Sequence, residues 1–191
     1  YARVEHATES GVYRSDDAGK TWTHMGLEKA GLIGRVRIHP TNPDVVFVAA
    51  VGNIFGPNKE RGVYRTKDGG KTWEAVLQAS DKTGAVDISI DPKNPNVIFA
   101  SMWAVERKPW SVTSGSMDGG LFRSLDGGTT WQKLTNGLPT KVMVGKIAVA
   151  VSGADSKRVY ALFEAANDEG GVYRSDDGGT SWTRVSANRN L

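Results

Sequence analysis

The chain has 191 residues, enough to bury the core of one or two domains, and its hydrophobic content of 39% is ordinary for a globular protein. A formal net charge of +3, with basic residues spread evenly along the chain, excludes a nucleic-acid-binding surface. The absence of cysteine excludes a disulfide scaffold and thiol chemistry, and no apolar run approaches the roughly 20 residues that cross a bilayer, so we expect no membrane insertion.

One eight-residue stretch occurs four times. It reads SDDAGKTW, TKDGGKTW, SLDGGTTW and SDDGGTSW, and its tryptophans are Trp22, Trp73, Trp131 and Trp182, with spacings of 51, 58 and 51 residues. The similarity extends to the flanks, because each copy follows a short strand pattern of the form GVYRS. A period near fifty residues indicates a repeat architecture in which each repeat is one supersecondary unit.

Taken in chain order, the second to fourth repeats each predict four short antiparallel strands, which we name A to D. Apolar and polar residues alternate, turns rich in Pro, Asn, Asp and Ser interrupt the pattern, and no segment keeps a helical period. The first repeat has no strand A, since Tyr1 already falls in strand B. The later repeats predict strands at 35–39, 45–51, 62–66 and 72–77, at 86–91, 97–104, 120–124 and 130–135, and at 145–151, 158–164, 171–175 and 181–185.

A repeated four-stranded meander of this length is typical of a β-propeller blade. We therefore predict an all-β chain that forms a single propeller segment over residues 1–191, with blades at about 1–30 (partial), 31–80, 81–138 and 139–191. Because neither terminus supplies the missing innermost strand, we expect an arc of a larger ring; a closed four-bladed ring is the alternative. An arc exposes two apolar blade faces, so its partners would be the remaining blades of a parent propeller or another copy of the chain.

The repeated stretch resembles the Asp-box, also called the BNR repeat, of sialidases, sortilin-type propellers and xyloglucanase-type glycoside hydrolases. With its Pro-Asn turns and fifty-residue blades, the chain most resembles the sortilin-type propellers of large bacterial proteins, which are often labelled glycosyl hydrolases. This resemblance implies an extracellular or periplasmic protein. The Asp-box residues are Ser15, Asp17, Gly19, Thr21 and Trp22; Thr66, Asp68, Gly70, Thr72 and Trp73; Ser124, Asp126, Gly128, Thr130 and Trp131; and Ser175, Asp177, Gly179, Ser181 and Trp182.

The Asp-box residues suit a tight hairpin between strands C and D. Each Asp can accept backbone N–H groups of the turn, each Gly permits a positive φ, and the Thr or Ser before the Trp can close the turn. We expect the Trp to bury a large surface between blades. A calcium loop is the alternative, although the alternating ligands and terminal Glu of such a loop are absent. A structural motif is needed in every blade, whereas an active site is needed only once, so we predict a structural role for the Asp-box. The same reasoning extends to the repeated arginines Arg14, Arg65, Arg123 and Arg174.

The loops between strands B and C lie at the opposite end of the blades from the Asp-boxes, and they differ in every repeat, which is typical of binding loops. The longest, in the third repeat, carries Trp103, Glu106, Arg107 and Trp110. Aromatic platforms beside charges suit a sugar ring or a peptide, so we predict a binding site here. Trp103 could instead pack in the core at the end of strand B, and Trp110 could cover a hydrophobic edge.

Two other B–C loops carry candidates for binding. In the second repeat Asn53 and Phe55 lie beside a Gly-Pro step, where they could form a ligand rim or a turn. In the first repeat His6 follows Glu5, which could act as an acid–base pair or belong to a solvated loop.

Catalysis has less support in the sequence. The Phe-Arg-Ile-Pro segment of sialidases is absent. A glycoside hydrolase needs two carboxylates about 5–10 Å apart, and Glu106 and Glu164 are the better candidates, although nothing in the sequence pairs them. The histidines share no ligand spacing, so we predict no metal and no cofactor.

Three functions remain open at this point. The first is a non-catalytic segment of a larger sortilin-like protein that presents its B–C loops to a protein, peptide or glycan. The second is an arc of a glycoside hydrolase with carboxylates on the channel face. The third is a structural module that assembles through its open blade edges.

Overall fold

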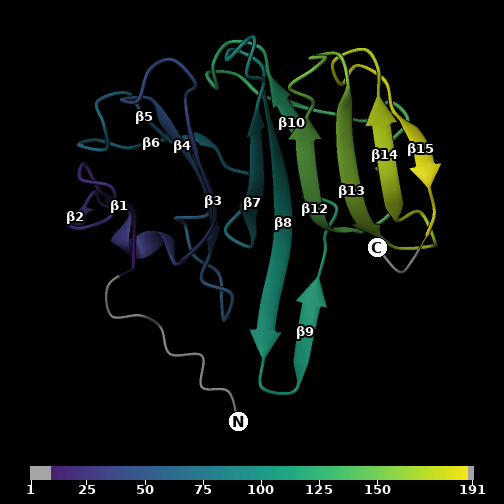
Figure 1. The fold of residues 1–191 in the computed structure, drawn as a ribbon. Helices are drawn as coiled ribbons and strands as arrows, with labels where there is room; N and C mark the ends of the chain where they lie inside the picture. The colour runs from purple at the N-terminus through teal and green to yellow at the C-terminus, as the bar shows by residue number, and fades with distance from the viewer. Residues whose placement is uncertain (1–9, 189–191) are drawn as a thin grey trace.

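The computed structural model describes residues 10–188, which form four antiparallel sheets side by side (Figure 1). We call the sheets blades one to four in chain order. Blade one contains β1 (Tyr13–Arg14) and β2 (Thr23–His24); blade two contains β3 (Leu32–Ile38), β4 (Val46–Gly52), β5 (Gly62–Thr66) and β6 (Glu74–Leu77); blade three contains β7 (Thr83–Ile90), β8 (Ile98–Lys108), β9 (Ser111–Ser114), β10 (Gly120–Ser124) and β11 (Gln132–Lys133); blade four contains β12 (Val144–Val151), β13 (Val159–Ala165), β14 (Gly171–Ser175) and β15 (Thr183–Ser186).

Blades two and four are meanders in which consecutive strands pair, and blade three keeps this order apart from the inserted β9. In blades two to four the turn between the first two strands has one geometry. In blade two the His39 N–H donates to the Val45 carbonyl at 2.9 Å, and the Val45 N–H donates to the Asn42 carbonyl at 3.1 Å. The Asn42 side chain also accepts the N–H two residues further on, as Asn94 and Asp155 do in the other blades, so an Asx turn reverses the chain.

The cores lie between the blades. Phe47 of blade two packs in one cluster with Ile88 and Ile98 of blade three, and Phe99 of blade three packs in another with Trp182 of blade four. Because burying one such side chain contributes about 2–3 kcal/mol, contacts between blades account for much of the stability. Blades two and three are covered on both faces along β4 and β7, whereas β13 of blade four alternates buried and exposed residues.

The structure differs from the sequence prediction in the third B–C loop. Strand B was predicted to end at residue 104, but β8 continues to Lys108, and β9 returns beside it. The predicted loop is therefore largely a hairpin, because the alternating Ser, Val and Thr of β9 pair with the end of β8 across a two-residue turn. In Figure 1 this hairpin projects from the end of the blades opposite to the Asp-box turns.

Blade one is the least complete sheet. Its two strands have only two residues each, although the GVYRS pattern before the Asp-box predicted a longer strand. Its expected strand B, which includes Tyr1, lies outside the described residues. A single 3-10 turn, η1 (Glu28–Ala30), which was not predicted, connects it to blade two. Within residues 10–188 no helix has the length and apolar character needed to cross a membrane.

Candidate functional site

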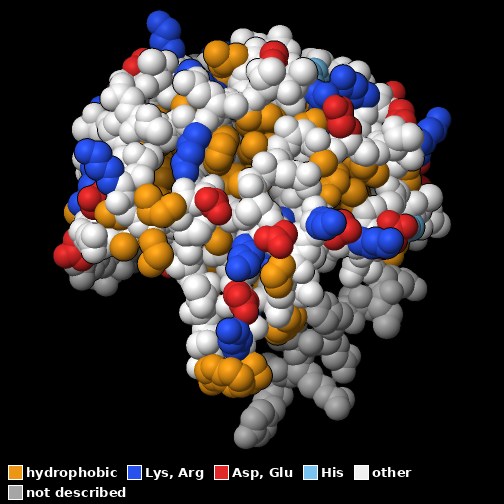
Figure 2. Space-filling model, turned by 180° about the vertical axis from the view of Figure 1, so that it is seen from behind, with side chains coloured by type: hydrophobic (Ala, Val, Ile, Leu, Met, Phe, Trp, Pro, Cys, Tyr) orange, Lys and Arg blue, Asp and Glu red, His pale blue; other side chains and the backbone are white. Residues whose placement is uncertain are grey.

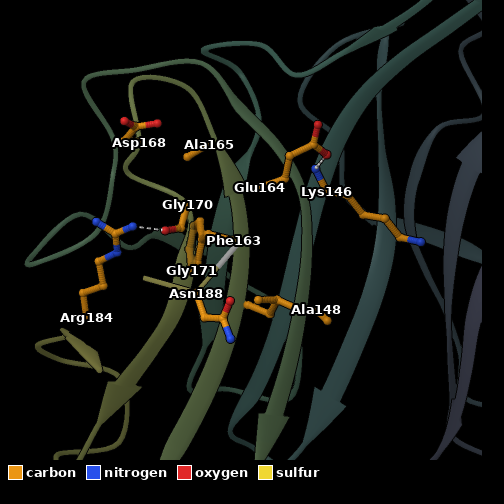
Figure 3. A pocket seen from close by; sticks show the side chains of 11 residues that line it. Lys146, Ala148, Phe163, Glu164, Ala165, Asp168, Gly170, Gly171, Arg184 and Asn188 are labelled. Carbon is orange, nitrogen blue, oxygen red and sulfur yellow. Dashed lines mark hydrogen bonds between the residues drawn. The ribbon is translucent and has the colours of Figure 1, made fainter. Parts of the chain in front are cut away.

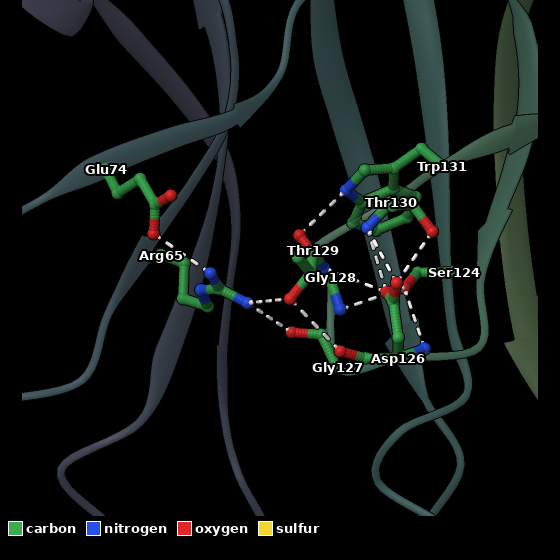
Figure 4. A network of polar contacts seen from close by, with 9 residues as sticks. All are labelled: Arg65, Glu74, Ser124, Asp126, Gly127, Gly128, Thr129, Thr130 and Trp131. Carbon is green, nitrogen blue, oxygen red and sulfur yellow. Dashed lines mark hydrogen bonds and ion pairs between the residues drawn. The ribbon is translucent and has the colours of Figure 1, made fainter.

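The Asp-box turn of blade three is a closed network of short hydrogen bonds (Figure 4). The Ser124 hydroxyl donates to Asp126 Oδ1 at 2.8 Å and accepts the Gly128 N–H at 2.8 Å. The Asp126 carboxylate then accepts both the N–H and the hydroxyl of Thr130, at 2.8 and 2.6 Å. Equivalent bonds form in the other three copies, where the hydroxyls come from Ser15 and Thr21, Thr66 and Thr72, and Ser175 and Ser181.

These bonds determine the charge of the Asp-box carboxylates. The Thr130 hydroxyl, the Thr130 N–H and the Ser124 hydroxyl hold the pKa of Asp126 far below its ordinary value. In blade one the N–H and hydroxyl of Thr21 lower the pKa of Asp17 to about 2. A carboxylate that stays ionised and faces donors of its own turn is unsuited to act as a general acid or as a calcium ligand.

The Asp-boxes of blades two, three and four also receive an arginine from the preceding blade. Arg65 of β5 is buried, and its Nη1 donates to the Gly127 carbonyl of blade three at 2.6 Å and to the Thr129 hydroxyl at 3.3 Å, while its Nη2 pairs with Glu74 at 2.9 Å (Figure 4). The same contact joins blade one to blade two, from Arg14 to the Gly69 carbonyl at 3.0 Å, and blade three to blade four, from Arg123 to the Gly178 carbonyl at 2.7 Å. The sequence predicted a structural role for these arginines, but it did not indicate their acceptors.

The Asp-box tryptophans differ in burial. Trp182 is 5% exposed, and its backbone N–H donates to the Asn136 carbonyl of blade three. The Trp73 indole donates to the Met25 carbonyl of blade one at 2.6 Å. The prediction of burial between blades is wrong for Trp22, which is 61% exposed. Trp73 and Trp182 contact the preceding blade, and Trp22 belongs to the first sheet of the described residues, so no described sheet precedes it.

The opposite end of the molecule carries a projecting hairpin, which we call the arm (residues 105–114). Its strands pair from Val105 and Ser114 out to Lys108 and Ser111, so residues 109 and 110 form the turn. Trp110 in this turn is 80% exposed. Figure 2 shows hydrophobic side chains gathered at the tip of a projection below the body of the protein, where the arm lies in Figure 1.

The arm is fixed to the body at its base. The Arg107 N–H donates to the Ile54 carbonyl of the blade-two loop at 2.7 Å, while its side chain stays exposed. Glu106 and Lys108 form an ion pair at 3.5 Å on the arm. These contacts present Trp110 on paired strands rather than on a free loop.

Trp103 lies at the base of the arm and is held on several sides. Its indole N–H donates to the Ser114 hydroxyl at 2.9 Å, which in turn donates to Glu164 Oε2 at 3.1 Å. The same Glu164 oxygen accepts the Lys146 N–H at 2.9 Å, and the Lys146 ammonium lies 5.9 Å from the centre of the Trp103 ring. Trp103 thus packs between blades three and four, and only Trp110 extends away from the body.

The blade-two loop is organised by a residue that the sequence analysis missed. Arg61 is 1% exposed, and burial lowers the pKa of its guanidinium, although the charges of Asp81 and Glu106 oppose this effect. The only sequence signal is one more Arg before strand C. Its guanidinium donates to the Asn58 side chain and to the backbone carbonyls of Val51, Asn53, Gly56, Lys82 and Val105.

The other predicted loop residues have separate surroundings. The Phe55 N–H donates to the Asn53 side chain at 3.0 Å, and the Asn53 N–H donates to the Asn58 side chain at 2.9 Å, so both asparagines shape a turn. Phe55 is exposed beside it. His6 lies outside the described residues.

Two hollows contain the candidate carboxylates, and they keep Glu106 apart from Glu164. A cavity of about 260 Å³ between the blade-two loop and the arm is lined by Glu106 and Asp118, together with Arg61 and Lys82. A wider hollow of about 620 Å³ lies on the exposed face of blade four and is lined by Glu164 (Figure 3). The structure therefore does not place the two predicted catalytic candidates in one site.

A family model described as sortilin, neurotensin receptor 3, matches residues 10–121, which is more than half of the chain. The chain belongs to this sortilin family. A second model, the BNR/Asp-box repeat, matches residues 122–133 of the sortilin-family chain. The resemblance predicted from the repeated octapeptide is thereby confirmed.

The curated relatives of this sortilin-family chain include glycoside hydrolases. It is 26% identical to the xyloglucanase Xgh74A of Acetivibrio thermocellus over 97% of its own length and 24% of that enzyme. It is 31% identical to a xyloglucanase of Hypocrea jecorina over 89% of its length and 20% of that enzyme. The chain thus spans about a quarter or less of these two relatives.

Solved structures confirm the predicted all-β propeller fold. An ancestral GH74 enzyme matches 95% of the chain and 22% of its own length with a TM-score of 0.70 at 22% identity. The GH74 enzyme of Niastella koreensis matches 92% of the chain and 26% of its own length with a TM-score of 0.65 at 19% identity. The described blades are therefore similar to one arc of a larger propeller.

Proposed function

We propose that this chain is a non-catalytic, glycan-binding arc of a larger Asp-box propeller. The observation that carries the proposal is the exposure of Trp110 at the tip of the arm. Its indole offers a flat apolar surface of the kind that a sugar ring can cover, with an N–H for a hydroxyl group. The xyloglucanase relatives favour xyloglucan over a peptide as the ligand.

The arm suits this task because it is ordered before any ligand arrives. Paired strands and the bond from Arg107 to Ile54 restrict the position of Trp110, so binding would cost little conformational entropy. Glu106 and Lys108 of the same arm offer acceptors and donors for sugar hydroxyls. Binding of extracellular polysaccharide also agrees with the extracellular or periplasmic location expected from the resemblance.

The separation of Glu106 from Glu164 supports a non-catalytic role. Glycoside hydrolysis requires two carboxyl groups on either side of one bond, and these two line different hollows. Glu164 also accepts hydrogen bonds from Ser114 and Lys146, which favours a structural role for it.

The proposal is tested by titration calorimetry of the full-length protein with xyloglucan oligosaccharides. Trp110→Ala should weaken binding about tenfold or more, which corresponds to about 1.4 kcal/mol. Trp22→Ala is the matched control, because it removes another exposed indole from the opposite end of the molecule. Equal affinities of Trp110→Ala and wild type would overturn the proposal.

A second candidate function is glycoside hydrolysis by the full-length protein. The cavity of about 260 Å³ favours it, because Glu106 and Asp118 both line that cavity. Under this alternative, Glu106→Gln and Asp118→Asn would each abolish release of reducing sugar from xyloglucan. A wild-type protein without turnover would exclude it and leave the binding proposal standing.

A further inference from the structure

The exposed face of blade four repeats a contact surface that is buried in the other blades. In β13, Tyr160 and Leu162 are 40% and 38% exposed, although the residues on either side of them are buried. At the matching positions of blades two and three, Ala49 and Ser101 are fully buried, as are the aromatic residues Phe47 and Phe99.

Tyr160 belongs to a repeated pair of an aromatic residue and an arginine on neighbouring strands. Tyr160 lies opposite Arg174, as Phe47 lies opposite Arg65 and Phe99 opposite Arg123. Blade four therefore carries a third copy of this pair.

In blades two and three, the aromatic ring of this pair packs against a glycine from the Asp-box of the next blade. A Cβ atom added to Gly128 would lie 2.7 Å from the Phe47 ring, and one added to Gly179 would lie 2.6 Å from the Phe99 ring. Only a glycine fits this approach, and the carbonyl one residue earlier accepts the arginine Nη1. The pair thus recognises the Gly-Gly step of an Asp-box.

The third arginine is already oriented for the same contact. Arg174 donates from Nε and Nη2 to the Asp176 carboxylate, both at 2.9 Å. In blade one Arg14 gives the same two nitrogens to Asp16 and uses Nη1 for the Gly69 carbonyl. Pairing with Asp176 therefore leaves Nη1 of Arg174 for a carbonyl acceptor.

The inner strand of blade four, β12, differs from the inner strand of blade three at one position that faces the next blade. Between earlier blades, Arg35 donates to Asp87 at 2.8 Å, and Asp87 also accepts the Val149 N–H at 3.0 Å. Blade four has Ala148 at the matching position, paired with Leu162. An incoming inner strand would meet an apolar surface here rather than a carboxylate.

We propose that the face formed by Ala148, Tyr160, Leu162 and Arg174 is the docking site for an Asp-box hairpin of the blade that follows in the same polypeptide. Within residues 10–188, the three arginine contacts to an Asp-box each join consecutive blades, and the chain covers only 24% of the xyloglucanase Xgh74A. The hollow lined by Glu164 is part of this blade-binding face and not a ligand pocket. The inference rests on the proposed arc of a larger propeller, but it is independent of the glycan site.

Hydroxyl-radical footprinting of the full-length protein tests this inference. The labelling rate of each tyrosine is divided by its rate in the unfolded protein and measured at two protein concentrations about a hundredfold apart. At both concentrations, the corrected rate of Tyr160 should lie within about twofold of the rate of buried Tyr173. Labelling about tenfold faster than Tyr173 would overturn the proposal. Protection that appears only at the higher concentration would assign the face to a second copy and overturn it equally.

The arginine contact has its own variant in the same measurement. Arg174→Ala should raise Tyr160 labelling about threefold or more, because the carbonyl of the docked hairpin loses its N–H donor. Lys157→Ala is the control, since this exposed side chain lies near the same end of blade four and should leave the rate unchanged. Unchanged Tyr160 labelling in Arg174→Ala would contradict the proposed contact.

Discussion

The two rims of the molecule use aromatic residues in opposite ways. On the Asp-box rim, Trp182 is buried against the preceding blade in a turn whose polar groups bond to one another. On the loop rim, Trp110 extends from paired strands into solvent. The Asp-box rim repeats because each blade must be joined to the next, and the loop rim varies because the scaffold does not depend on its tip.

The largest difference between the rims should come from a pair of phenylalanines. Phe99→Ala should lower the free energy of unfolding by about 3–5 kcal/mol, because it leaves a cavity under the Asp-box of blade four. Phe55→Ala on the loop rim should change it by less than about 0.5 kcal/mol. Urea denaturation measures both. Equal costs would remove the distinction between the rims.

Arg61 is an exception on the loop rim, because this residue has a structural role there. Arg61→Met keeps the apolar stem but leaves several carbonyls without a donor, so we expect a loss of about 3 kcal/mol. Arg107→Met changes an exposed arginine of the same rim and should be nearly neutral. If both variants unfold like wild type, the loop does not depend on the buried guanidinium.

The hydroxyl of the Asp-box should have a smaller effect. Ser124→Ala removes one donor and one acceptor from a buried turn and should cost about 1–3 kcal/mol. Ser124→Thr should restore stability, since Thr66 makes the same bonds in blade two. A Thr variant as unstable as the Ala variant would assign the loss to packing.

Acid should weaken the Asp-box rim gradually. Hydrogen bonds lower the folded-state pKa of Asp17 to about 2, below its unfolded value of about 3.9. Its contribution is therefore fully present above about pH 4 and is lost as the pH falls towards 2. Denaturation curves between these values should show a shallower decline for Asp17→Asn. Identical declines would mean that Asp17 is not responsible.

More of the fold than of the candidate site could be predicted from the sequence. The octapeptide and its spacing predicted the strand order of three blades, because every repeat contains its own turn residues and alternating strands. The extension of β8 was missed because the divergence of this segment from the other repeats indicated a binding loop, whereas its residues pair as two strands from Val105 and Ser114 out to Lys108 and Ser111. Burial of Trp22 was predicted from its motif, yet burial depends on the neighbouring blade.

Contacts between blades could not be predicted from local sequence. The acceptor of Arg65 is a backbone carbonyl 62 residues away, and any residue type supplies a carbonyl. Arg61 has the same kind of acceptors, so its buried position leaves almost no trace in the sequence. Trp110, in contrast, could be named as a candidate from the sequence, because an aromatic residue in a divergent loop stands out there, and the structure shows that it is exposed.

The central claim is that the Asp-box rim stabilises the fold and the loop rim binds ligand. It is tested most directly by measuring unfolding and xyloglucan-oligosaccharide binding in both Trp182→Ala and Trp110→Ala. We predict that Trp182→Ala loses about 3–5 kcal/mol of stability and keeps its affinity while folded, whereas Trp110→Ala keeps its stability and binds about tenfold more weakly. A Trp110→Ala protein that binds normally, or a Trp182→Ala protein of wild-type stability, would contradict the account.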